Sequence, residues 1–466
     1  MSATAMRSTV DSALLASLSA GFRGRILQSE DDGYTEARAV YNAMHDRRPA
    51  LIVQPVDTAD VVTAVAFAGD HDLLLSVKGG GHNVNGFGTN DDGLVIDLSA
   101  MRGAFVDPNA RTATVGGGAT WGDFDHATHA FGLATPGGIL STTGVAGLTL
   151  GGGIGYLNRQ YGLSSDNLLA AEIVTADGGI VTASADEQPD LFWAIRGGGG
   201  NFGVVTRLTF NLHPVSTVYG GPIFFPAEAS EDVLAFYRDF IRSAPRELGA
   251  FFAYHEAPPE PFVPEELHGQ KACAIVVCYT GPLDRAEAAI RPIRAAAPVA
   301  LDLCGPIPYP ALNSMFDALL PAGLHHYWKS DFVRELSDAA IEVHASHGPQ
   351  VPNFLSLMHL YPLDGAVQDV AKDATGFAYR DVDFTHIIAG IDSDRSNMPA
   401  RIAWVRDYWA ALHPLSAGGA YSNFMMEEGQ SRIRTTYLDN YPKLVAAKRR
   451  WDPSNLFRMN QNIPPA

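Results

Sequence analysis

A histidine that follows three glycines is the feature of this sequence that most directly suggests chemistry. The apolar residues 73–77 lead into the loop Lys78, Gly79, Gly80, Gly81, His82 and Asn83. Glycines after a strand let backbone N–H groups approach a phosphate closely, because no Cβ intervenes. An imidazole beside such a loop can act as a base, a metal ligand or a covalent anchor, and the alternative is an ordinary turn histidine.

Further glycine-rich segments follow at residues 116–118, 144–155 and 197–203. Several such loops are typical of a site for one long, phosphate-bearing ligand. Gly198, Gly200 and Gly203 formally match the dinucleotide fingerprint, which requires a helix directly after the loop. Because the alternating, β-branched residues 204–212 predict a strand instead, the loops indicate a phosphate site that is not of the Rossmann type.

Composition narrows the classes of partner. The chain has 466 residues, 46% of them hydrophobic, and a formal net charge of −18. This length predicts two or three domains, and the acidic balance argues against nucleic acid as a partner. The sequence contains no run of about 18 apolar residues, as a membrane span would need, and Asp11 interrupts any signal-peptide core. We expect a cytoplasmic monomer or homodimer that acts on a small molecule.

The cysteines and histidines do not form a metal-binding pattern. Cys273, Cys278 and Cys304 are too few for a disulfide framework, and we interpret them as small buried side chains. His325 and His326 are adjacent in sequence, which suits chelation from one face poorly. The sequence therefore predicts no metal site.

The elements that must position these residues change in character along the chain. In the first part, the expected strands lie at 51–53, 73–77, 94–98, 112–115, 171–175, 180–183 and 204–212, with helices at 60–68 and 121–130. After residue 216 the glycine clusters stop, and expected strands at 271–277, 332–336, 354–361 and 385–391 lie among helices. This pattern predicts an α+β fold: two α+β units, then an antiparallel sheet covered by helices.

At this level of detail the chain resembles the FAD-linked oxidases of the vanillyl-alcohol oxidase/PCMH superfamily, in their berberine-bridge-enzyme-like branch. The motifs that carry the resemblance are PALIV at 49–53, GGGH at 79–82, GLVIDLS at 93–99, LATPGG at 133–138, GGGIG at 151–155, YGLSSDN at 161–167, DLFWAIRGG at 190–198 and WDPSNLFR at 451–458. Each motif alone is weak, but all of them in this order are specific. The chain looks most like bacterial members that act on small heterocycles or tailor natural products.

The resemblance implies a domain plan and a set of cofactor contacts. It places a PCMH-type FAD-binding domain at 1–215, a substrate-binding domain at 216–420, and at 421–466 a C-terminal segment that returns to the FAD domain. The residues that it places at the cofactor are His82, Gly79, Gly80, Gly81, Asn83, Gly138, Thr142, Gly144, Val145, Gly147, Gly152, Gly155, Asp166, Asn167, Gly203, Val204, Val205, Asn460 and Asn462. For Asp166 and Asn167 a role as turn formers remains equally open.

In the family, a histidine at the position of His82 is bonded covalently to the flavin. Many relatives add a second link from a cysteine shortly before the GGGIG loop. This chain has Leu140 there, and its cysteines all lie beyond residue 270. We therefore expect one covalent bond, through His82, and a pocket for small substrates.

Two further expectations concern oxygen and the catalytic base. Val145 stands where relatives control oxygen access, and its small side chain resembles the oxygen-permissive type, which favours O₂ as electron acceptor; ordinary core packing is the alternative. Tyr421 resembles a tyrosine that faces the flavin in several members, and its alternative is a packed aromatic residue. His359, Tyr361 and Asp364 are second-rank candidates, and strand alternation puts His359 and Tyr361 on one face.

Three hypotheses about function follow. The first is an oxidase that takes hydride from a C–H bearing oxygen or nitrogen in a small aromatic, heterocyclic or polyketide-like substrate and passes electrons to O₂, forming hydrogen peroxide. The second is a flavin-dependent oxygenase or cyclase of natural-product biosynthesis. The third, a flavin-binding protein without activity, is disfavoured because His82, Val145 and Tyr421 occur together.

Overall fold

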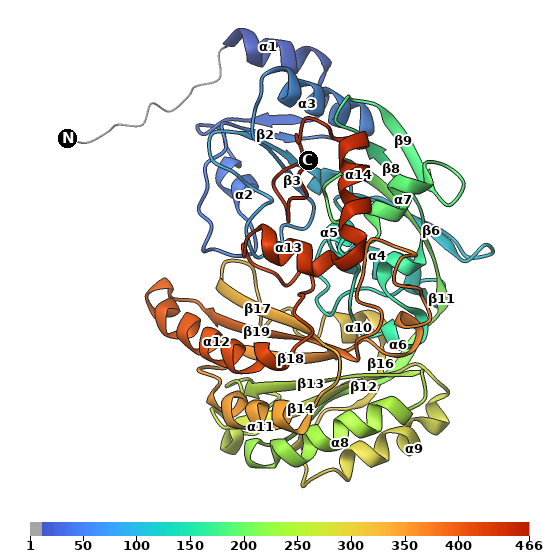
Figure 1. The fold of residues 1–466 in the computed structure, drawn as a ribbon, viewed down its shortest axis with the longest axis vertical. Coiled ribbons are helices and arrows are strands. Elements are labelled where there is room, and N and C mark those ends of the chain that lie inside the picture. The colour runs from blue at the N-terminus through green and yellow to red at the C-terminus, as the bar shows by residue number, and fades with distance from the viewer. Residues whose placement is uncertain (1–11, 466) are drawn as a thin grey trace.

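The computed structural model describes residues 12–465, and in it the first two of three main sheets lie side by side, with the third sheet below them along the long axis of the molecule (Figure 1). The first two sheets and the C-terminal helices form the upper half in this view, and the third sheet with its helices forms the lower half. The α+β architecture with an antiparallel, helix-covered sheet is thus confirmed.

The first sheet within residues 12–465 has the order β1-β2-β4-β3 and carries the His82 loop at the end of β3. Its strands are β1 (Arg25–Leu27), β2 (Leu51–Gln54), β3 (Leu75–Lys78) and β4 (Leu94–Asp97). Strands β2, β3 and β4 are parallel. The helices of this part are α1 (Ser12–Gly21), α2 (Tyr34–Arg38) and α3 (Thr58–Asp70). Helix α3 begins where the Asp57 side chain accepts a hydrogen bond from the N–H of Asp60, as an N-cap does.

The second sheet of the described chain is antiparallel, in the order β5-β6-β10-β8-β9. Its strands are β5 (Ala104–Asp107), β6 (Thr112–Gly116), β8 (Leu168–Val174), β9 (Ile180–Ser184) and β10 (Val204–Asn211), and β7 (Leu133–Ala134) pairs with β11 (His213–Pro214) beside it. The helices of this part are α4 (Trp121–His129), α5 (Val145–Leu150), α6 (Asn158–Tyr161) and α7 (Pro189–Ile195).

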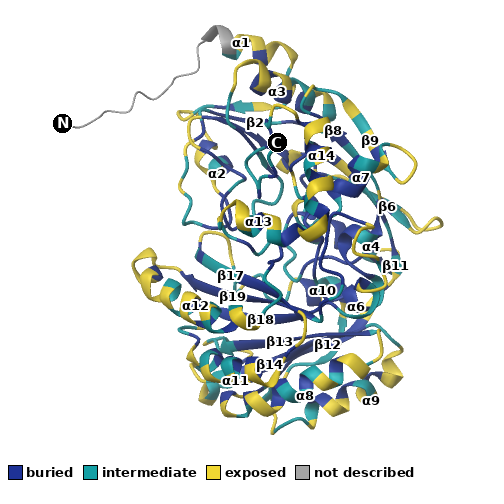
Figure 2. Ribbon diagram, viewed as in Figure 1, coloured by how far each residue is buried: buried dark blue, intermediate teal, exposed yellow. Residues whose placement is uncertain are grey.

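The third sheet has two different faces. Its strands are β12 (Thr217–Pro226), β13 (Leu248–Glu256), β14 (Lys271–Tyr279), β15 (Leu301–Asp302), β16 (Gly305–Pro308), β17 (His325–Val333), β18 (Leu357–Pro362) and β19 (Phe384–Asp392). One face packs on α8 (Ser230–Ser243), α9 (Leu283–Arg294), α11 (Asp338–His347) and α12 (Met398–Leu412). Their outer sides are exposed, whereas the strands are buried (Figure 2). The other face turns toward the first half of the chain, where α10 (Tyr309–Asn313) also packs.

Two sequence expectations about this sheet needed correction. The expected strand at 332–336 is β17, which begins seven residues earlier and includes the pair His325 and His326. The residues of β17, HHYWKSDFV, do not alternate between polar and apolar, so periodicity did not reveal where the strand begins. Strands β12, β13, β15 and β16 were not expected, and among them β13, whose sequence is LGAFFAYHE, lies in the middle of the sheet.

The last helices of the described chain, α13 (Gln430–Tyr437) and α14 (Tyr441–Trp451), return to the upper half, where α14 packs against α7 (Figure 1). The buried ammonium of Lys448 fixes this return: it pairs with Asp452 at 2.7 Å and donates to the carbonyls of Asn201 and Phe457. None of the helices in residues 12–465 is both long and apolar enough to cross a membrane.

A buried histidine in the third sheet predicts acid sensitivity. His386 on β19 is 1% exposed, and neither ring nitrogen has a partner in the described chain. Burial lowers its pKa to about 4, against about 6.5 in an unfolded chain. As the pH falls, His386 becomes protonated at a higher pH in the unfolded state than in the folded state. The free energy of unfolding is therefore greatest above pH 6.5 and decreases as the pH drops toward 4, by about 1.4 kcal/mol at about pH 5.5.

When the pH falls from about 8 to about 5.5, the unfolding free energy of the wild type should therefore decrease by about 1.4 kcal/mol more than that of His386→Phe. Urea unfolding at the two pH values measures the difference. An unchanged pH dependence in the variant would contradict the assignment.

Candidate active site

One cavity of about 320 Å³ lies between the glycine loops and the inner face of the third sheet. The loop at 79–83, Gly144, Gly147 and the segment 198–203 supply one side, and strands β17, β18 and β19 supply the other. Residues 459–461 and the segment 422–424 complete its wall. Loops far apart in the sequence therefore meet at one site, as the sequence predicted.

The glycine loop after β3 offers free donors to this cavity. No acceptor within the described chain receives the N–H groups of Gly81, His82 and Asn83. At Gly80 an added Cβ would lie 2.3 Å from the backbone nitrogen of Gly144, so only glycine permits this approach of the two loops. Free N–H groups on closely packed glycine loops are a suitable cradle for a pyrophosphate.

His82 is held in a defined orientation at the cavity. Its ring stacks on Tyr41 with a centroid distance of 4.0 Å and an interplanar angle of 17°. Its Nδ1 lies 3.4 Å from the hydroxyl of Thr143, and the backbone of Thr142 also hydrogen-bonds the ring. Burial lowers the pKa of His82 to about 4. The imidazole is therefore neutral at pH 7 and retains the lone pair that a nucleophile needs.

The facing wall carries a polar pair on β18. Its strand alternation places His359 and Tyr361 on the cavity side, whereas Met358 and Leu360 pack under the helices. The hydroxyl of Tyr361 lies 2.8 Å from Nδ1 of His359. Burial raises the pKa of Tyr361 and lowers that of His359, which His255 lowers further. Both groups are thus neutral at rest.

Two side chains of β17 add unpaired polar atoms to the cavity wall. His326 and Trp328 line it, and the ring nitrogens of both lack partners in the described chain. Burial lowers the pKa of His326 to about 3. These nitrogens are available to polar groups of a bound molecule.

Tyr421, the first-rank candidate for the base, is not among the residues that line the cavity. Its hydroxyl accepts hydrogen bonds from the N–H of Gly153 at 2.9 Å and from the Asn423 amide at 2.7 Å. Burial raises its pKa to about 12. These contacts fit the packed aromatic residue that the sequence had left as the alternative for Tyr421, and Asn423 lines the cavity.

Asp364 lies away from the cavity as well. Its carboxylate accepts three hydrogen bonds of 2.8 to 3.0 Å from the guanidinium of Arg159. Arg159 is 3% exposed and also donates to the carbonyl of Leu248. Because a buried guanidinium needs a counter-charge, Asp364 has a structural role here.

Asp166 and Asn167 are turn formers in the structure. Asp166 accepts from the N–H of Leu163 and pairs with Arg380, and the Asn167 amide donates to the Leu163 carbonyl at 2.9 Å. Neither side chain lines the cavity. The YGLSSDN motif therefore builds the turn.

The remaining cofactor predictions divide by position. Those that line the cavity are Gly79, Gly80, Gly81, His82, Asn83, Gly138, Gly144, Gly147, Gly203, Val205 and Asn460. Those that do not are Thr142, Val145, Gly152, Gly155, Val204 and Asn462, besides Asp166 and Asn167.

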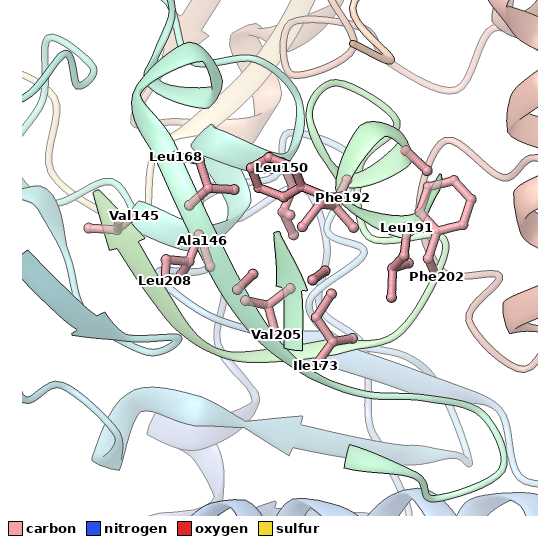
Figure 3. Packing of buried hydrophobic residues seen from close by; sticks show 14 of the residues in the cluster. Val145, Ala146, Leu150, Leu168, Ile173, Leu191, Phe192, Phe202, Val205 and Leu208 are labelled. Carbon is pink, nitrogen blue, oxygen red and sulfur yellow. The ribbon is translucent and has the colours of Figure 1, made fainter. Parts of the chain in front are cut away.

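For three of the residues that miss the cavity, Gly155, Val204 and Val145, the structure shows what the residue does instead. A Cβ on Gly155 would lie 1.9 Å from the Gly137 carbonyl, so this glycine serves close backbone packing. Val204 alternates with Val205 and faces the first sheet's core. Val145 is wholly buried in a cluster with Ala146 and Leu208 (Figure 3), which is the packing role that the sequence had left open.

Tyr41 and His255 were not singled out from the sequence. Tyr41 precedes the first recognisable motif, and no spacing connects it to His82. For His255 a signal existed: alternation along β13 from Phe251 through Ala253 puts it on the inner face.

Together these features define a class of protein. Free N–H groups on the glycine loop, a neutral histidine stacked in place beside them, and a polar pair on the facing sheet fit a flavin dinucleotide, which the residues of the two walls would hold. The site is that of a flavin-linked oxidoreductase.

Comparison with known proteins identifies the family. The family model described as "FAD binding domain" matches residues 49–184, and that described as "Berberine and berberine like" matches residues 420–464. The chain is 34% identical over 421 residues to an FAD-linked oxidoreductase of Dictyostelium discoideum, covering 90% of this chain and 89% of that protein. It is 31% identical over 461 residues to (R)-6-hydroxynicotine oxidase of Paenarthrobacter nicotinovorans, covering 95% and 97%.

Solved structures agree. The crystal structure of 6-hydroxy-D-nicotine oxidase from Arthrobacter nicotinovorans superimposes with a TM-score of 0.85 at 27% identity, covering 96% of this chain and 98% of that one. BBE-like 1 of Physcomitrella patens gives 0.86 at 25% identity, covering 97% and 99%. The chain belongs to the berberine-bridge-enzyme-like family of FAD-linked oxidoreductases and is itself an FAD-dependent oxidoreductase.

Proposed function

We propose that this protein is an oxidase that removes a hydride from a C–H bearing oxygen or nitrogen in a small aromatic, heterocyclic or polyketide-like substrate. Electrons pass to O₂, which leaves as hydrogen peroxide. The observation that carries this proposal is the cavity in which the His82 loop faces Tyr361 and His359. The oxidase named among the relatives supports the choice of O₂ as acceptor.

The residues present fit FAD held by one covalent bond. The free N–H groups of the 81–83 loop suit its pyrophosphate, and the neutral His82 ring suits attachment to its isoalloxazine. When bound, FAD supplies the hydride acceptor. No cysteine occurs among the described residues that line the cavity, and Cys273 and Cys278 are buried in β14. A second covalent link has no group to form it there.

Tyr361 takes the proton that the substrate loses. Hydride removal from an alcohol or amine leaves a cationic centre unless the adjacent O–H or N–H gives up its proton. The raised pKa of Tyr361 rules out a resting tyrosinate at pH 7. The hydroxyl can therefore accept a proton only as it passes its own to Nδ1 of His359, 2.8 Å away.

An oxygen-uptake screen tests this function. Compounds of the proposed class, with (R)-6-hydroxynicotine as the first, are added to the purified protein while an electrode records O₂ and a peroxidase dye records peroxide. We expect one peroxide for each O₂ consumed with a true substrate. Under ¹⁸O₂, product without ¹⁸O supports the oxidase, whereas ¹⁸O in the product would overturn it in favour of the oxygenase.

A further inference from the structure

Three side chains form a hydrogen-bonded chain that leads from the cavity to the end of strand β13, in the middle of the third sheet. The Tyr361 hydroxyl lies 2.8 Å from Nδ1 of His359, and Nε2 of His359 lies 2.9 Å from Nε2 of His255. His255 is on β13, where Ala253 stands opposite His359 in the register. His255 therefore extends the polar row of β18 along the same inner face of the sheet.

The hydrogen-bonded chain connects the cavity with a residue outside it. Tyr361 and His359 are 4% and 5% exposed and line the cavity. His255 does not line the cavity and is only partly buried. The ring of Phe251 packs against both His359 and Tyr361, with centroid distances of 4.9 and 4.8 Å, and covers the middle of the chain. The hydrogen-bonded chain thus begins at Tyr361, in the cavity wall, and ends at His255, which is partly accessible to water.

The contact between two imidazole nitrogens restricts where the hydrogens can be. One Nε2 must carry a hydrogen and the other must offer a lone pair. If Tyr361 donates to His359, then His359 carries its hydrogen on Nε2 and His255 carries its own on Nδ1. If His359 instead donates to Tyr361, then His359 carries its hydrogen on Nδ1 and His255 carries its own on Nε2. In either arrangement the two neutral histidines are opposite tautomers.

We propose that His255 is the outlet of a proton relay that carries the substrate's proton from Tyr361 through His359 to water, an inference that rests on the proposed function. The substrate O–H or N–H breaks as a new O–H forms on Tyr361. The former Tyr361 proton binds Nδ1 of His359, the Nε2 proton of His359 passes to Nε2 of His255, and His255 releases its Nδ1 proton to solvent. The electron pair leaves separately, as hydride to FAD.

The relay removes the need for a lasting buried charge. A tyrosinate or an imidazolium inside the cavity wall would be unsolvated, at a cost of several kcal/mol. In the relay the positive charge passes to His255, which is in partial contact with water. Burial lowers the pKa of His255 to about 4, so at pH 7 the ring gives up its extra proton readily.

The charged side chains next to His255 do not hold its ring in one protonation state. Glu256 and Lys271, the nearest along β13 and β14, pair with each other, and Lys271 also donates to the Val351 carbonyl. The opposing charges of this pair offset each other at the ring. His255 is therefore free to take up and release a proton in each turnover.

The hydrogen pattern can be tested without substrate. Nitrogen-15 NMR of protein with labelled histidine reports which ring nitrogen is protonated, and His255→Gln and His359→Gln assign the two signals. We expect opposite tautomers for His255 and His359 in the wild type. Two rings in the same tautomer would overturn the relay, whether or not the protein proves to be an oxidase.

Kinetics test the transfer itself, with a compound that passes the oxygen-uptake screen. In His255→Gln the amide can still hydrogen-bond His359 but cannot take up a proton. We expect flavin content and KM to be retained, anaerobic flavin reduction to slow about tenfold, and the dependence of its rate on D₂O fraction to change from curved to linear, since fewer protons move together.

His268→Gln is the matched control. This histidine is in the loop between β13 and β14, and its Nε2 bonds the carbonyl of Val263, so its replacement leaves the rate and the curvature unchanged. Reduction of His255→Gln at the wild-type rate with the wild-type curvature would overturn the relay. If no compound reduces the flavin, the proposed function fails. The NMR experiment still shows whether His255 and His359 have the opposite tautomers that the hydrogen-bonded chain requires.

Discussion

His82→Ala is expected to abolish the protein-bound flavin that survives acid denaturation. Alanine removes the neutral ring that Tyr41 holds against the cavity, and with it the nucleophile. In the wild type, the acid-precipitated protein band should fluoresce under ultraviolet light, and the intact mass should exceed that of the chain by one FAD. Both signals should be lost completely in the variant.

His326→Gln is the control for this experiment. His326 lines the same cavity and its ring lies 4.9 Å from that of Tyr41, yet it should leave the covalent flavin in place. Flavin that stays with the His82→Ala pellet would mean that a residue other than His82 forms the covalent bond. Flavin released from the wild type by acid would mean noncovalent binding.

Tyr361→Phe is expected to slow flavin reduction by about 10² to 10⁴, the usual contribution of a positioned acid–base group. Phenylalanine keeps the ring contacts with Phe251 and Phe424 but removes the oxygen that we propose receives the substrate's proton. Anaerobic stopped-flow reduction measures the rate. The flavin spectrum and the substrate affinity should change little, because the loss concerns the transition state.

Tyr421→Phe distinguishes the two tyrosines. Its hydroxyl bonds Gly153 and Asn423 rather than the cavity, so we expect reduction within a few-fold of the wild type and a stability loss of about 1 kcal/mol from the lost hydrogen bonds. A larger kinetic defect in Tyr421→Phe than in Tyr361→Phe would return the role of base to Tyr421.

What the sequence predicts well here depends on local pattern. The glycines at 79–81 predicted a phosphate loop because a strand that runs directly into three glycines is typical of a loop that approaches a phosphate, and in the structure all three line the cavity. Alternation put His359 and Tyr361 on one face, and only the choice of face needed the structure. The same local logic could not give the surroundings of Tyr421 and Asp364, since a motif gives their position in the chain but not the partner that each side chain meets.

The rest of the site depends on long-range register. His255 and His359 are 104 residues apart and meet because β13 pairs with β18. Arg159, which pairs with Asp364, is 205 residues away from it. Such partners are fixed by packing of whole elements, which composition and periodicity leave undetermined.

The return of the chain through α13 and α14 has a consequence for biogenesis. Residues 459–461 form part of the cavity wall, and Gln461 donates to the carbonyl of Met425 while Lys448 ties the segment to the loop at Asn201. During synthesis on the ribosome, the glycine loops emerge hundreds of residues before this wall. A nascent chain therefore presents the glycine loops to solvent, and the cavity is complete only after translation has passed residues 459–461.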